Sequence, residues 1–380
     1  MANARLRAVF MRGGTSKAVM FRSADLPASR DAWDPIFREV MGSPDPNGRQ
    51  LDGMGGGISS LSKICVIGPP SRPDADVDYT FAQIGVRDSF VDYGANCGNM
   101  SSAVGPFALE EGLVRGPDSG EATVRIHNTN TSKIIVARFP VLGGTLAAGG
   151  DIEIDGVAGA AAPIRLEFLE PGGARTGRLL PTGSATDELE VEGLGRVQAS
   201  CVDAANPCVF VAAEAVGKTG DELPDALDGD AAFLQRMEAI RRAASVKMGI
   251  AGDLETAGKM TGIPKVAMVT GPRAGRTLSG RELTADDADI WVRMISVGQP
   301  HRATPITGAI CLAVATRIPG SIPARLCRAK GPIRIAHPSG VTLVDAGVSG
   351  SDGGLKADYG AVYRTARRLF EGNVVYRMPD

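Results

Sequence analysis

The sequence predicts a mixed α+β protein built from two similar halves. Most of its 380 residues fall into short β-type segments punctuated by glycine, and only a few segments have helical character. Two of the helical segments resemble each other, because each follows a polar turn that contains glycine and consists largely of small, apolar residues. Such a helix can lie buried inside a β layer with its N-terminus facing a cleft. The pairing of the two segments indicates two related halves.

The expected strands are short apolar runs bounded by glycine or polar residues. The first of them, around Val77 to Phe81, alternates apolar and polar side chains, which is typical of a strand with one buried face. The expected strands are Val77–Val86, Thr123–Ile126, Lys133–Arg138, Val209–Ala212, Lys265–Val269 and Ile333–Ala336.

Two of the expected helices are amphipathic or capped, and we interpret both as packing elements. Asp230 is placed to cap a helix whose apolar face includes Met237 and Ile240. Thr284 and Asp287 resemble a capping box, which predicts a second helix running into Ile290-Trp291-Val292.

The two buried helices are the more informative ones. The first is expected over Met100–Leu109 after the turn Asn96-Cys97-Gly98-Asn99, and the second over Ala309–Ala315 after Thr304-Pro305-Ile306-Thr307-Gly308. Glycine or Pro-Gly ends each of them, at Gly112 and at Pro319-Gly320.

Composition and charge favour a small-molecule partner. With 41 basic and 43 acidic residues the formal charge is −2, and no long run of one sign suggests binding to nucleic acid. No segment approaches the roughly 18 apolar residues of a membrane span, and the N-terminal residues lack the apolar centre of a secretory signal. We therefore expect a cytoplasmic protein that binds neither nucleic acid nor membrane. The 49 glycines indicate many tight turns and backbone close to a small ligand.

The cysteines and histidines do not form a metal-site pattern. The six cysteines include no C-x-x-C pair, and the three histidines include no H-x-x-x-H or H-E-x-x-H pair. We expect free thiols, no structural disulfides, no metal and no cofactor.

The segment Arg12-Gly13-Gly14-Thr15-Ser16-Lys17 combines two cations, two hydroxyls and a glycine-rich backbone. This combination suits the binding of carboxylates or phosphate, although the spacing is not that of a P-loop. The alternative is an ordinary hairpin turn with solvated Arg12 and Lys17, and the residues alone leave both open.

A glycine- and serine-rich loop leads from Asp52 to Lys63. It is not a dinucleotide-binding motif, because Ile58 occupies the position of the last required glycine. The loop delivers Lys63 onto an apolar strand, Ile64–Ile67, where partial desolvation would lower its pKa toward that of a general base. A lysine whose ammonium reaches solvent from the strand end is the alternative.

Cys97 is the most informative thiol. It lies between Asn96 and Gly98 at the expected start of a helix, where free N–H groups and the helix dipole lower a thiol pKa. His301 and Arg302 directly precede the second buried helix, and His337 lies in a tight turn, so we expect binding or turn roles for them.

Taken together, several motifs resemble the PrpF family, which contains 2-methylaconitate cis-trans isomerase, methylitaconate Δ-isomerase and 4-oxalomesaconate tautomerase. The resemblance covers essentially the whole chain and rests on Met11-Arg12-Gly13-Gly14-Thr15-Ser16-Lys17, Asp52-Gly53-Met54-Gly55-Gly56, Ser62-Lys63, Asn96-Cys97-Gly98-Asn99, Leu180-Pro181-Thr182-Gly183 and His337-Pro338-Ser339-Gly340. It implies a diaminopimelate epimerase-like fold, with two similar domains that each wrap a β-barrel-like sheet around a central helix, and an active site between them. We expect residues 1–185, completed by about 366–380, to form one domain and residues 186–365 the other.

The resemblance also implies the chemistry. The epimerases use one cysteine from each half, but here Pro305-Ile306-Thr307-Gly308 occupies the second position. In the PrpF family a lysine that matches Lys63 replaces the second thiol, so the resemblance implies Lys63 and Cys97 as the catalytic pair. We expect a cofactor-independent isomerase that moves a proton and a double bond in a small unsaturated tricarboxylate, with 2-methylaconitate or aconitate preferred. The alternatives are 4-oxalomesaconate tautomerase, methylitaconate Δ-isomerase and a non-catalytic carboxylate-binding protein. The order of the two proton-transfer roles stays open.

The implied carboxylate site draws on both halves. A homodimer is expected only because two-fold oligomers are common. The expected substrate-binding residues are Arg12, Gly13, Gly14, Thr15, Ser16, Lys17, Ser62, Asn96, Gly98 and Asn99 from the first half, and Thr182, Gly183, Ser184, His301, Arg302, Thr307 and Gly308 from the second.

Overall fold

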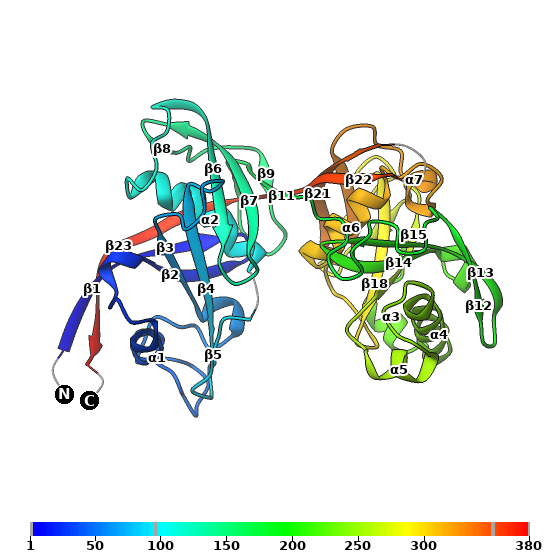
Figure 1. Ribbon diagram of the computed structural model, residues 1–380, viewed down its shortest axis with the longest axis horizontal. Coiled ribbons are helices and arrows are strands. Elements are labelled where there is room, and N and C mark those ends of the chain that lie inside the picture. Colours follow the sequence, from blue (N-terminus) through cyan, green and yellow to red (C-terminus); the bar gives the residue numbers. More distant parts are fainter. Residues whose placement is uncertain (1–2, 95–96, 351–353, 379–380) are drawn as a thin grey trace. The chain divides into compact units, whose positions relative to one another are not determined.

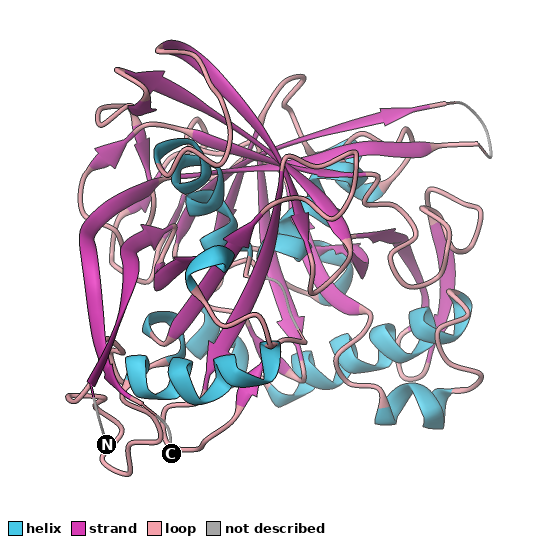
Figure 2. Cartoon of the chain, turned by 60° about the vertical axis from the view of Figure 1, so that its left-hand side comes forward, coloured by secondary structure: helices cyan, strands magenta, loops and turns pink. Residues whose placement is uncertain are grey.

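The computed structural model describes residues 3–94, 97–350 and 354–378 (Figure 1). Its internal contacts divide the chain into two compact units, Met1–Glu167 with Tyr363–Asp380 (unit 1) and Phe168–Val362 (unit 2). The division falls after Glu167, whereas the sequence prediction places it after residue 185. Strands dominate the ordered backbone (Figure 2).

Unit 1 is a sheet that wraps around one helix. Pairing connects its main strands in the order β23–β1–β2–β3–β4–β6–β7. The helix α2 contacts six of these strands and the short strand β8. The bounds are β1 (Asn3–Gly13), β2 (Ser16–Arg22), β3 (Lys63–Gly68), β4 (Val77–Ile84), α2 (Gly98–Glu110), β6 (Ser119–Asn128), β7 (Lys133–Leu142), β8 (Thr145–Leu146) and β23 (Ala366–Arg377).

Small residues allow α2 to lie inside this sheet. Nearly all of the helix is buried, and a Cβ at Gly105 would come within 2.8 Å of the Phe139 ring and 3.1 Å of the Ala137 methyl group. The helix α1 (Trp33–Met41) covers the opposite face of the sheet, where Phe37 and Val40 pack with residues of β2 and β3. The sheet of unit 1 therefore has an α1 face and an α2 face.

Unit 2 repeats the arrangement of a sheet around a helix. Pairing connects its strands in the order β12–β13–β14–β15–β18–β20–β21–β22, and the apolar helix α6 contacts β13, β14 and β21. The helix α4 packs with a separate cluster of buried side chains that includes Val209 and Met268. The bounds are β12 (Asp187–Val191), β13 (Gly195–Ala204), β14 (Asn206–Ala212), α4 (Ala231–Lys247), β15 (Lys265–Thr270), β18 (Ile290–Ser296), α6 (Ile306–Ala315), β20 (Ile333–His337), β21 (Gly340–Ser349) and β22 (Lys356–Arg364).

The remaining elements are short. The strands are β5 (Val91–Asp92), β9 (Ile152–Glu153), β10 (Ala160–Ala161), β11 (Ile164–Leu169), β16 (Gly275–Arg276), β17 (Glu282–Leu283) and β19 (Gln299–Pro300). The helices are α3 (Pro224–Asp228), α5 (Leu254–Lys259), α7 (Ile322–Leu326) and four 3₁₀ turns, Ser23–Asp25, Arg30–Ala32, Ser59–Leu61 and Ala213–Val216.

Most expected elements are confirmed, and one is wrong. Each expected strand lies within or largely overlaps an observed one, both buried helices are present, and the Asp230 carboxylate accepts from Phe233 N at the start of α4. The expected helix after Thr284 is instead β18. The Asp287 carboxylate accepts from Thr284 N and Oγ1 and closes a turn. Trp291 to Ile295 then pair with β15, and Ile290 and Trp291 pair with β20. Sheet pairing of this β-branched and aromatic run outweighs the local capping signal.

Candidate active site

Lys63 is the first residue of β3 and faces α2. Side chains alternate along a strand, and Ile64 and Val66 pack on the α1 face. Lys63 and Cys65 therefore point to the α2 face. Lys63 is only 8% exposed, and its Nζ lies 5.0 Å from the centroid of the Phe81 ring. The structure thus places the predicted lysine inside the sheet of unit 1, at the end of a buried strand.

The partner of Lys63 is a neutral amide. Gln83 lies opposite Lys63 in the antiparallel pairing of β3 and β4, and Lys63 Nζ donates to Gln83 Oε1. Gln83 Nε2 donates to the carbonyl oxygens of Ser59 at 3.0 Å and Ser62 at 2.9 Å. Sequence reasoning missed Gln83, because only the strand register brings it next to Lys63.

A second glutamine holds the segment that leads into Lys63. Gln50 is 1% exposed, and its Oε1 accepts from Ser62 Oγ at 2.5 Å and from Gly57 N at 2.9 Å. Its Nε2 donates to Ser43 Oγ at 2.8 Å. Ser62 is predicted above as a substrate contact, but it is fully buried and donates its hydroxyl hydrogen to Gln50. Its observed role is to anchor the start of β3.

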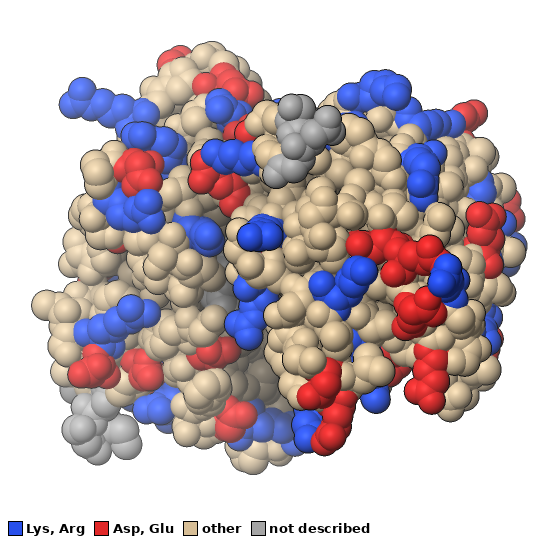
Figure 3. Space-filling model, turned by 45° about the vertical axis from the view of Figure 1, so that its right-hand side comes forward, with Lys and Arg blue, Asp and Glu red and all other residues tan. Residues whose placement is uncertain are grey.

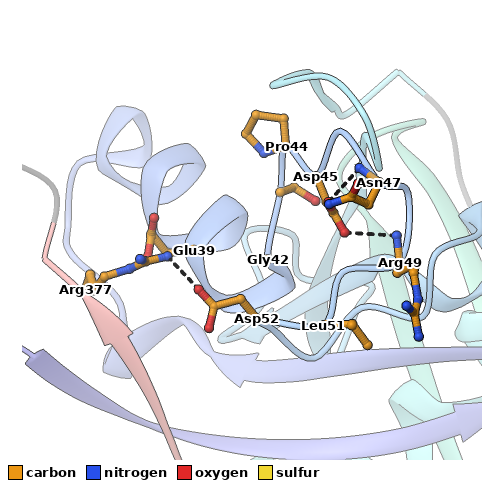
Figure 4. A pocket seen from close by; sticks show the side chains of 10 residues that line it. Glu39, Gly42, Pro44, Asp45, Asn47, Arg49, Leu51, Asp52 and Arg377 are labelled. Atoms are coloured by element: carbon orange, nitrogen blue, oxygen red, sulfur yellow. Dashed lines mark hydrogen bonds and ion pairs between the residues drawn. The ribbon is translucent and has the colours of Figure 1, made fainter.

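The loop that supplies Gln50 is organised by one carboxylate. Asp45 accepts from the N–H groups of Asn47, Arg49 and Gln50 at 2.6–2.9 Å, and these bonds lower the pKa of Asp45 (Figure 4). Gln50 itself has a positive φ of 53°. The loop borders a cavity of 420 Å³ that is also lined by Glu39, Asp52 and Arg377, where Arg377 forms ion pairs with both carboxylates. Neither Lys63 nor Cys97 lines this cavity.

Cys97 lies at the N-terminus of α2. It is the residue that precedes the helix, it has an extended backbone, and its carbonyl accepts from Ser101 N and Ser101 Oγ. The N–H groups of Gly98 and Asn99 lie in the first turn, where no intrahelical carbonyl is available to them. Such N–H groups and the helix dipole favour an anion at this end of the helix. Asn96 lies outside the described residues.

The thiol of Cys65 connects the surroundings of Lys63 and Cys97. Cys65 follows Lys63 by two residues on the same face of β3, and the charges of Lys63 and Cys97 both influence its pKa, after the larger effect of burial. Cys65 Sγ donates to Tyr79 Oη at 3.8 Å, and burial raises the pKa of both groups. Cys65 and Tyr79 therefore stay neutral. Cys97 is partly exposed, whereas Cys65 is buried, so Cys97 is the accessible thiol of these two cysteines.

The glycine turn between β1 and β2 packs directly against the start of α2. A Cβ at Gly13 would come within 2.7 Å of Asn99 O, and one at Gly14, which has a φ of +52°, within 2.3 Å of Asn99 Oδ1. Asn99 Nδ2 donates to Thr15 Oγ1 at 3.1 Å. Ser16 is buried and, by strand alternation with Ala18, points to the α2 face, as Lys63 does. The structure therefore brings this turn together with the N-terminus of α2.

Arg12 and Lys17 leave the same hairpin on the other face. They are cross-strand neighbours, and Lys17 follows the alternation of Val19 and Phe21, which pack on the α1 face. Arg12 Nη1 donates to the carbonyls of Gly14 and Thr365, and burial together with the nearby Arg367 lowers its pKa. Arg12 also lines a cavity of 680 Å³ with Arg367 and Arg368. Contrary to the sequence expectation, these two cations are not gathered with Lys63.

The other expected contacts lie in unit 2. Thr182 Oγ1 donates to the Asp187 carboxylate at 2.7 Å, and Gly183, with a φ of +82°, forms a turn in which its N–H donates to Leu180 O. Ser184 N donates to Thr182 Oγ1 at 3.3 Å. These bonds hold Thr182, Gly183 and Ser184 in a turn that precedes β12.

The residues before α6 differ in how strongly they are held. His301 Nε2 is buried and has no hydrogen-bond partner among the described residues, and burial together with Lys265 lowers the His301 pKa. Arg302 is exposed and pairs with Asp225 at 2.8 Å. Thr307 is exposed in the first turn of α6, after the cap residue Pro305, and Gly308 lies against the Met294 side chain. Within this group, the Nε2 atom of His301 is the buried polar atom that lacks a hydrogen-bond partner in the described part of the chain.

The remaining cysteines and His337 have structural surroundings. All six cysteines are free, as expected, and burial raises the pKa of Cys201 to about 12. His337 ends β20, and its Nδ1 accepts from Ser339 N at 3.2 Å within the turn to β21. Among the residues that the structure describes, no three His, Cys, Asp or Glu side chains are grouped so that they could hold a metal ion.

On the face shown in Figure 3, basic and acidic side chains both occur and neither covers the face. Within the described ranges, none of the helices combines the length and the apolar character needed to cross a membrane.

Comparison with curated proteins gives relatives along the full length of the chain. The 3-methylitaconate isomerase of Eubacterium barkeri is 42% identical over 375 residues, which cover 97% of each chain. The 2-methyl-aconitate isomerase of Cupriavidus necator is 40% identical, with coverage of 97% of this chain and 96% of the relative. The 4-oxalomesaconate tautomerase of Pseudomonas putida is also 40% identical, with coverage of 98% and 97%.

A solved structure shares the fold. The crystal structure of a methylitaconate-delta-isomerase matches with a TM-score of 0.91 and 40% identity, covering 99% of this chain and 96% of that one. This match confirms the expected diaminopimelate epimerase-like class, with a sheet around a central helix in each unit. The family model described as "PrpF protein" matches residues 3–377. From this match and the full-length relatives, the chain belongs to the PrpF family.

Proposed function

We propose that the protein is an isomerase that moves a proton and a double bond in a small unsaturated tricarboxylate, with Lys63 and Cys97 as the catalytic pair. The preferred substrates are 2-methylaconitate and aconitate, and no cofactor takes part. The observation that supports the proposal is that Lys63 lies on the α2 face of β3, a strand that α2 contacts, while Cys97 lies at the N-terminus of α2.

The reaction needs one base and one acid on an allylic unit. The base removes a proton from a carbon next to the double bond, and the C–H electron pair forms a new C=C bond. The original π electrons move into the adjacent carboxylate, which gives a dienolate. Return of a proton to a carbon of this unit completes the isomerisation. The former double bond is single in the dienolate, so rotation about it before reprotonation gives cis–trans isomerisation.

The described residues suit each part of this reaction. Lys63 and Cys97 each can hold or release a proton, which is what acid–base catalysis requires. The N–H groups of Gly98 and Asn99 point out of the helix N-terminus and suit a substrate carboxylate or the developing dienolate. The Ser16 hydroxyl lies on the α2 face and supplies a further donor. We propose that this set, with the Gly13–Gly14 turn packed behind it, binds the substrate.

We also propose the expected residues of unit 2 as substrate contacts, with less support than those of unit 1. His301 has a buried nitrogen without a partner in the described part of the chain, so it is the strongest of them. Thr182 and Arg302 already bind the carboxylates of Asp187 and Asp225, which leaves them fewer free donors.

A tautomerase acting on 4-oxalomesaconate is the second candidate function. The relative from Pseudomonas putida with that name is as similar in identity as the methylaconitate isomerase from Cupriavidus necator. The same Lys63–Cys97 pair would serve, because a keto–enol or allylic shift also proceeds through an enolate. Methylitaconate Δ-isomerisation is a third use of the same pair.

The test is a parallel NMR assay in D₂O with 2-methylaconitate, trans-aconitate, methylitaconate and 4-oxalomesaconate. The proposal expects isomerisation with incorporation of deuterium for the first or second compound. Conversion of 4-oxalomesaconate alone would replace it with the tautomerase. Tight binding without exchange on all four would instead support a non-catalytic carboxylate-binding protein.

A further inference from the structure

Lys63 is held by a partner that bears no charge. Among the described residues, its Nζ has the Gln83 Oε1 acceptor and the Phe81 ring, and no ion pair with a carboxylate. A carboxylate within hydrogen-bond distance would favour the ammonium form, whereas an amide oxygen accepts a hydrogen from either –NH₃⁺ or –NH₂. The contact with Gln83 can therefore persist while Lys63 gains and loses a proton.

The orientation of the Gln83 amide is fixed by the backbone. The Gln83 Nε2 donates hydrogen bonds to the backbone carbonyl oxygens of Ser59 and Ser62. The Ser62 carbonyl is itself fixed, because it also accepts from Ile84 N at 3.0 Å. A flipped amide would place its oxygen against these carbonyls and an N–H against the Lys63 ammonium. The observed orientation is thus the one in which an acceptor faces Lys63.

We propose that Gln83 is a positioning residue that holds one N–H of Lys63 and thereby aims the lone pair of its neutral amine. This inference rests on the proposed role of Lys63 in proton transfer. Since one N–H of the amine is held toward Gln83 Oε1, the lone pair must point away from Gln83. Gln83 thereby converts a flexible four-carbon side chain into a directed base without fixing its charge.

Other titratable groups around Lys63 come from each neighbouring element. Cys65 on β3 and Tyr79 on β4 have raised pKa values and are neutral. Cys97 lies at the start of α2, and Asp92 of β5 is the cross-strand neighbour of Gln83. The Asp92 carboxylate accepts from Gly94 N at 2.7 Å and forms no ion pair with Lys63. Gln83 is therefore the position at which a new charge acts most directly on Lys63.

The experiment compares Gln83→Glu and Gln83→Leu with the wild type. In Gln83→Glu, the carboxylate is repelled by the two carbonyls and attracted to the ammonium, so the acid limb of the pH profile of kcat/KM should move upward by about 1–3 pH units. Its activity should recover at alkaline pH. In Gln83→Leu, the amine loses its fixed direction, and kcat should fall about 10- to 100-fold with KM changed less than about threefold.

Matched controls separate this role from a structural one. Gln235→Glu and Gln235→Leu make the same changes at an exposed glutamine on α4 of unit 2 and should leave the profile unchanged. A Gln83→Glu profile without a shift, together with a Gln83→Leu kcat within twofold of wild type, overturns the proposal. If Gln83→Leu does not fold, the test is whether the activity of Gln83→Glu recovers at alkaline pH. A purely structural defect would not be reversed by raising the pH.

The Lys63→Ala variant distinguishes the two claims. If Lys63→Ala retains the wild-type rate, the proposed function of Lys63 fails whatever Gln83 does. If Lys63→Ala is inactive while both Gln83 variants behave as wild type, only the positioning role is rejected.

Discussion

Single residues around Lys63 show that two side-chain amides, of Gln83 and of the buried Gln50, hold the segments next to it. Gln83 orients Lys63, and Gln50 binds three groups of the loop that leads to it, namely Ser43, Gly57 and Ser62. A buried donor or acceptor that loses its partner costs about 1–3 kcal/mol. The loop before Lys63 is therefore held by hydrogen bonds that depend on one side chain.

Replacement of Gln50 tests this dependence. Gln50→Ala removes the partners of two buried hydroxyls, of Ser43 and Ser62, and of the partly buried Gly57 N–H, and we expect the free energy of unfolding to fall by about 2–4 kcal/mol, as judged from the cost per group. Urea denaturation gives the measurement, and Gln198→Ala, at an exposed position of β13, is the control. A Gln50→Ala protein as stable as the control would contradict the assigned role.

His301 provides a pH-dependent prediction at the same scale. Burial lowers its pKa below the ordinary value of 6.5, with Lys265 adding to the effect. The unfolded chain therefore binds this proton more readily, so the contribution of His301 to stability is present above pH 6.5 and is lost as the pH falls through the folded pKa. The wild type should lose more stability than His301→Asn between pH 7 and roughly pH 5, measured by thermal unfolding. Parallel curves for the two proteins would exclude the effect.

Whole elements explain which parts of the site could be predicted from sequence. Lys63, Cys97 and the two buried helices carry local signals: an apolar strand after a glycine loop, and small residues after a polar turn. The cations Arg12 and Lys17 are expected in the same site from the composition of their own glycine-rich segment and from the family resemblance. Strand alternation places these cations on the α1 face, and that parity depends on a register that sequence does not reveal. The pairing of β3 with β4 creates the contact of Gln83 with Lys63, and the folding of one loop brings Gln50 to Ser43, Gly57 and Ser62, so no local sequence pattern indicates either glutamine.

The fit of α2 inside its sheet gives a prediction for this element. A methyl group at Gly105 would meet the Phe139 ring at 2.8 Å and Ala137 at 3.1 Å. We expect Gly105→Ala to destabilise the protein by about 1–3 kcal/mol through overpacking. Gly252→Ala, where the added methyl group meets no atom within 4 Å, is the control and should change stability by less than about 0.5 kcal/mol. Equal unfolding midpoints for the two variants would show that α2 has room to move.

At the scale of the whole molecule, the two ends of the chain belong to the same unit. β1 pairs with β23 along its whole length, from Asn3 with Arg377 to Gly13 with Ala366. Unit 1 is therefore incomplete until the last strand is made, although unit 2 is continuous in sequence.

Deletion of the chain from Ala366 onward tests this topology. This deletion removes β23, which is the partner of β1 on one of its two edges in the described part of the chain. It also exposes the apolar groups that β23 covers. We expect the truncated protein to lack a cooperative thermal transition for unit 1 and to be inactive. A truncated protein with wild-type circular dichroism and activity would contradict the assignment of β23 to unit 1.

The central claim is that Lys63 and Cys97 transfer the proton in an allylic isomerisation, and solvent exchange tests it most directly. The measurement is the rate of deuterium incorporation from D₂O into 2-methylaconitate or trans-aconitate, by NMR, for wild type, Lys63→Ala and Cys97→Ser. Loss of one proton-transfer group is expected to slow incorporation by about 10²- to 10⁴-fold. Incorporation at the wild-type rate in both variants, with the fold intact, would contradict the account.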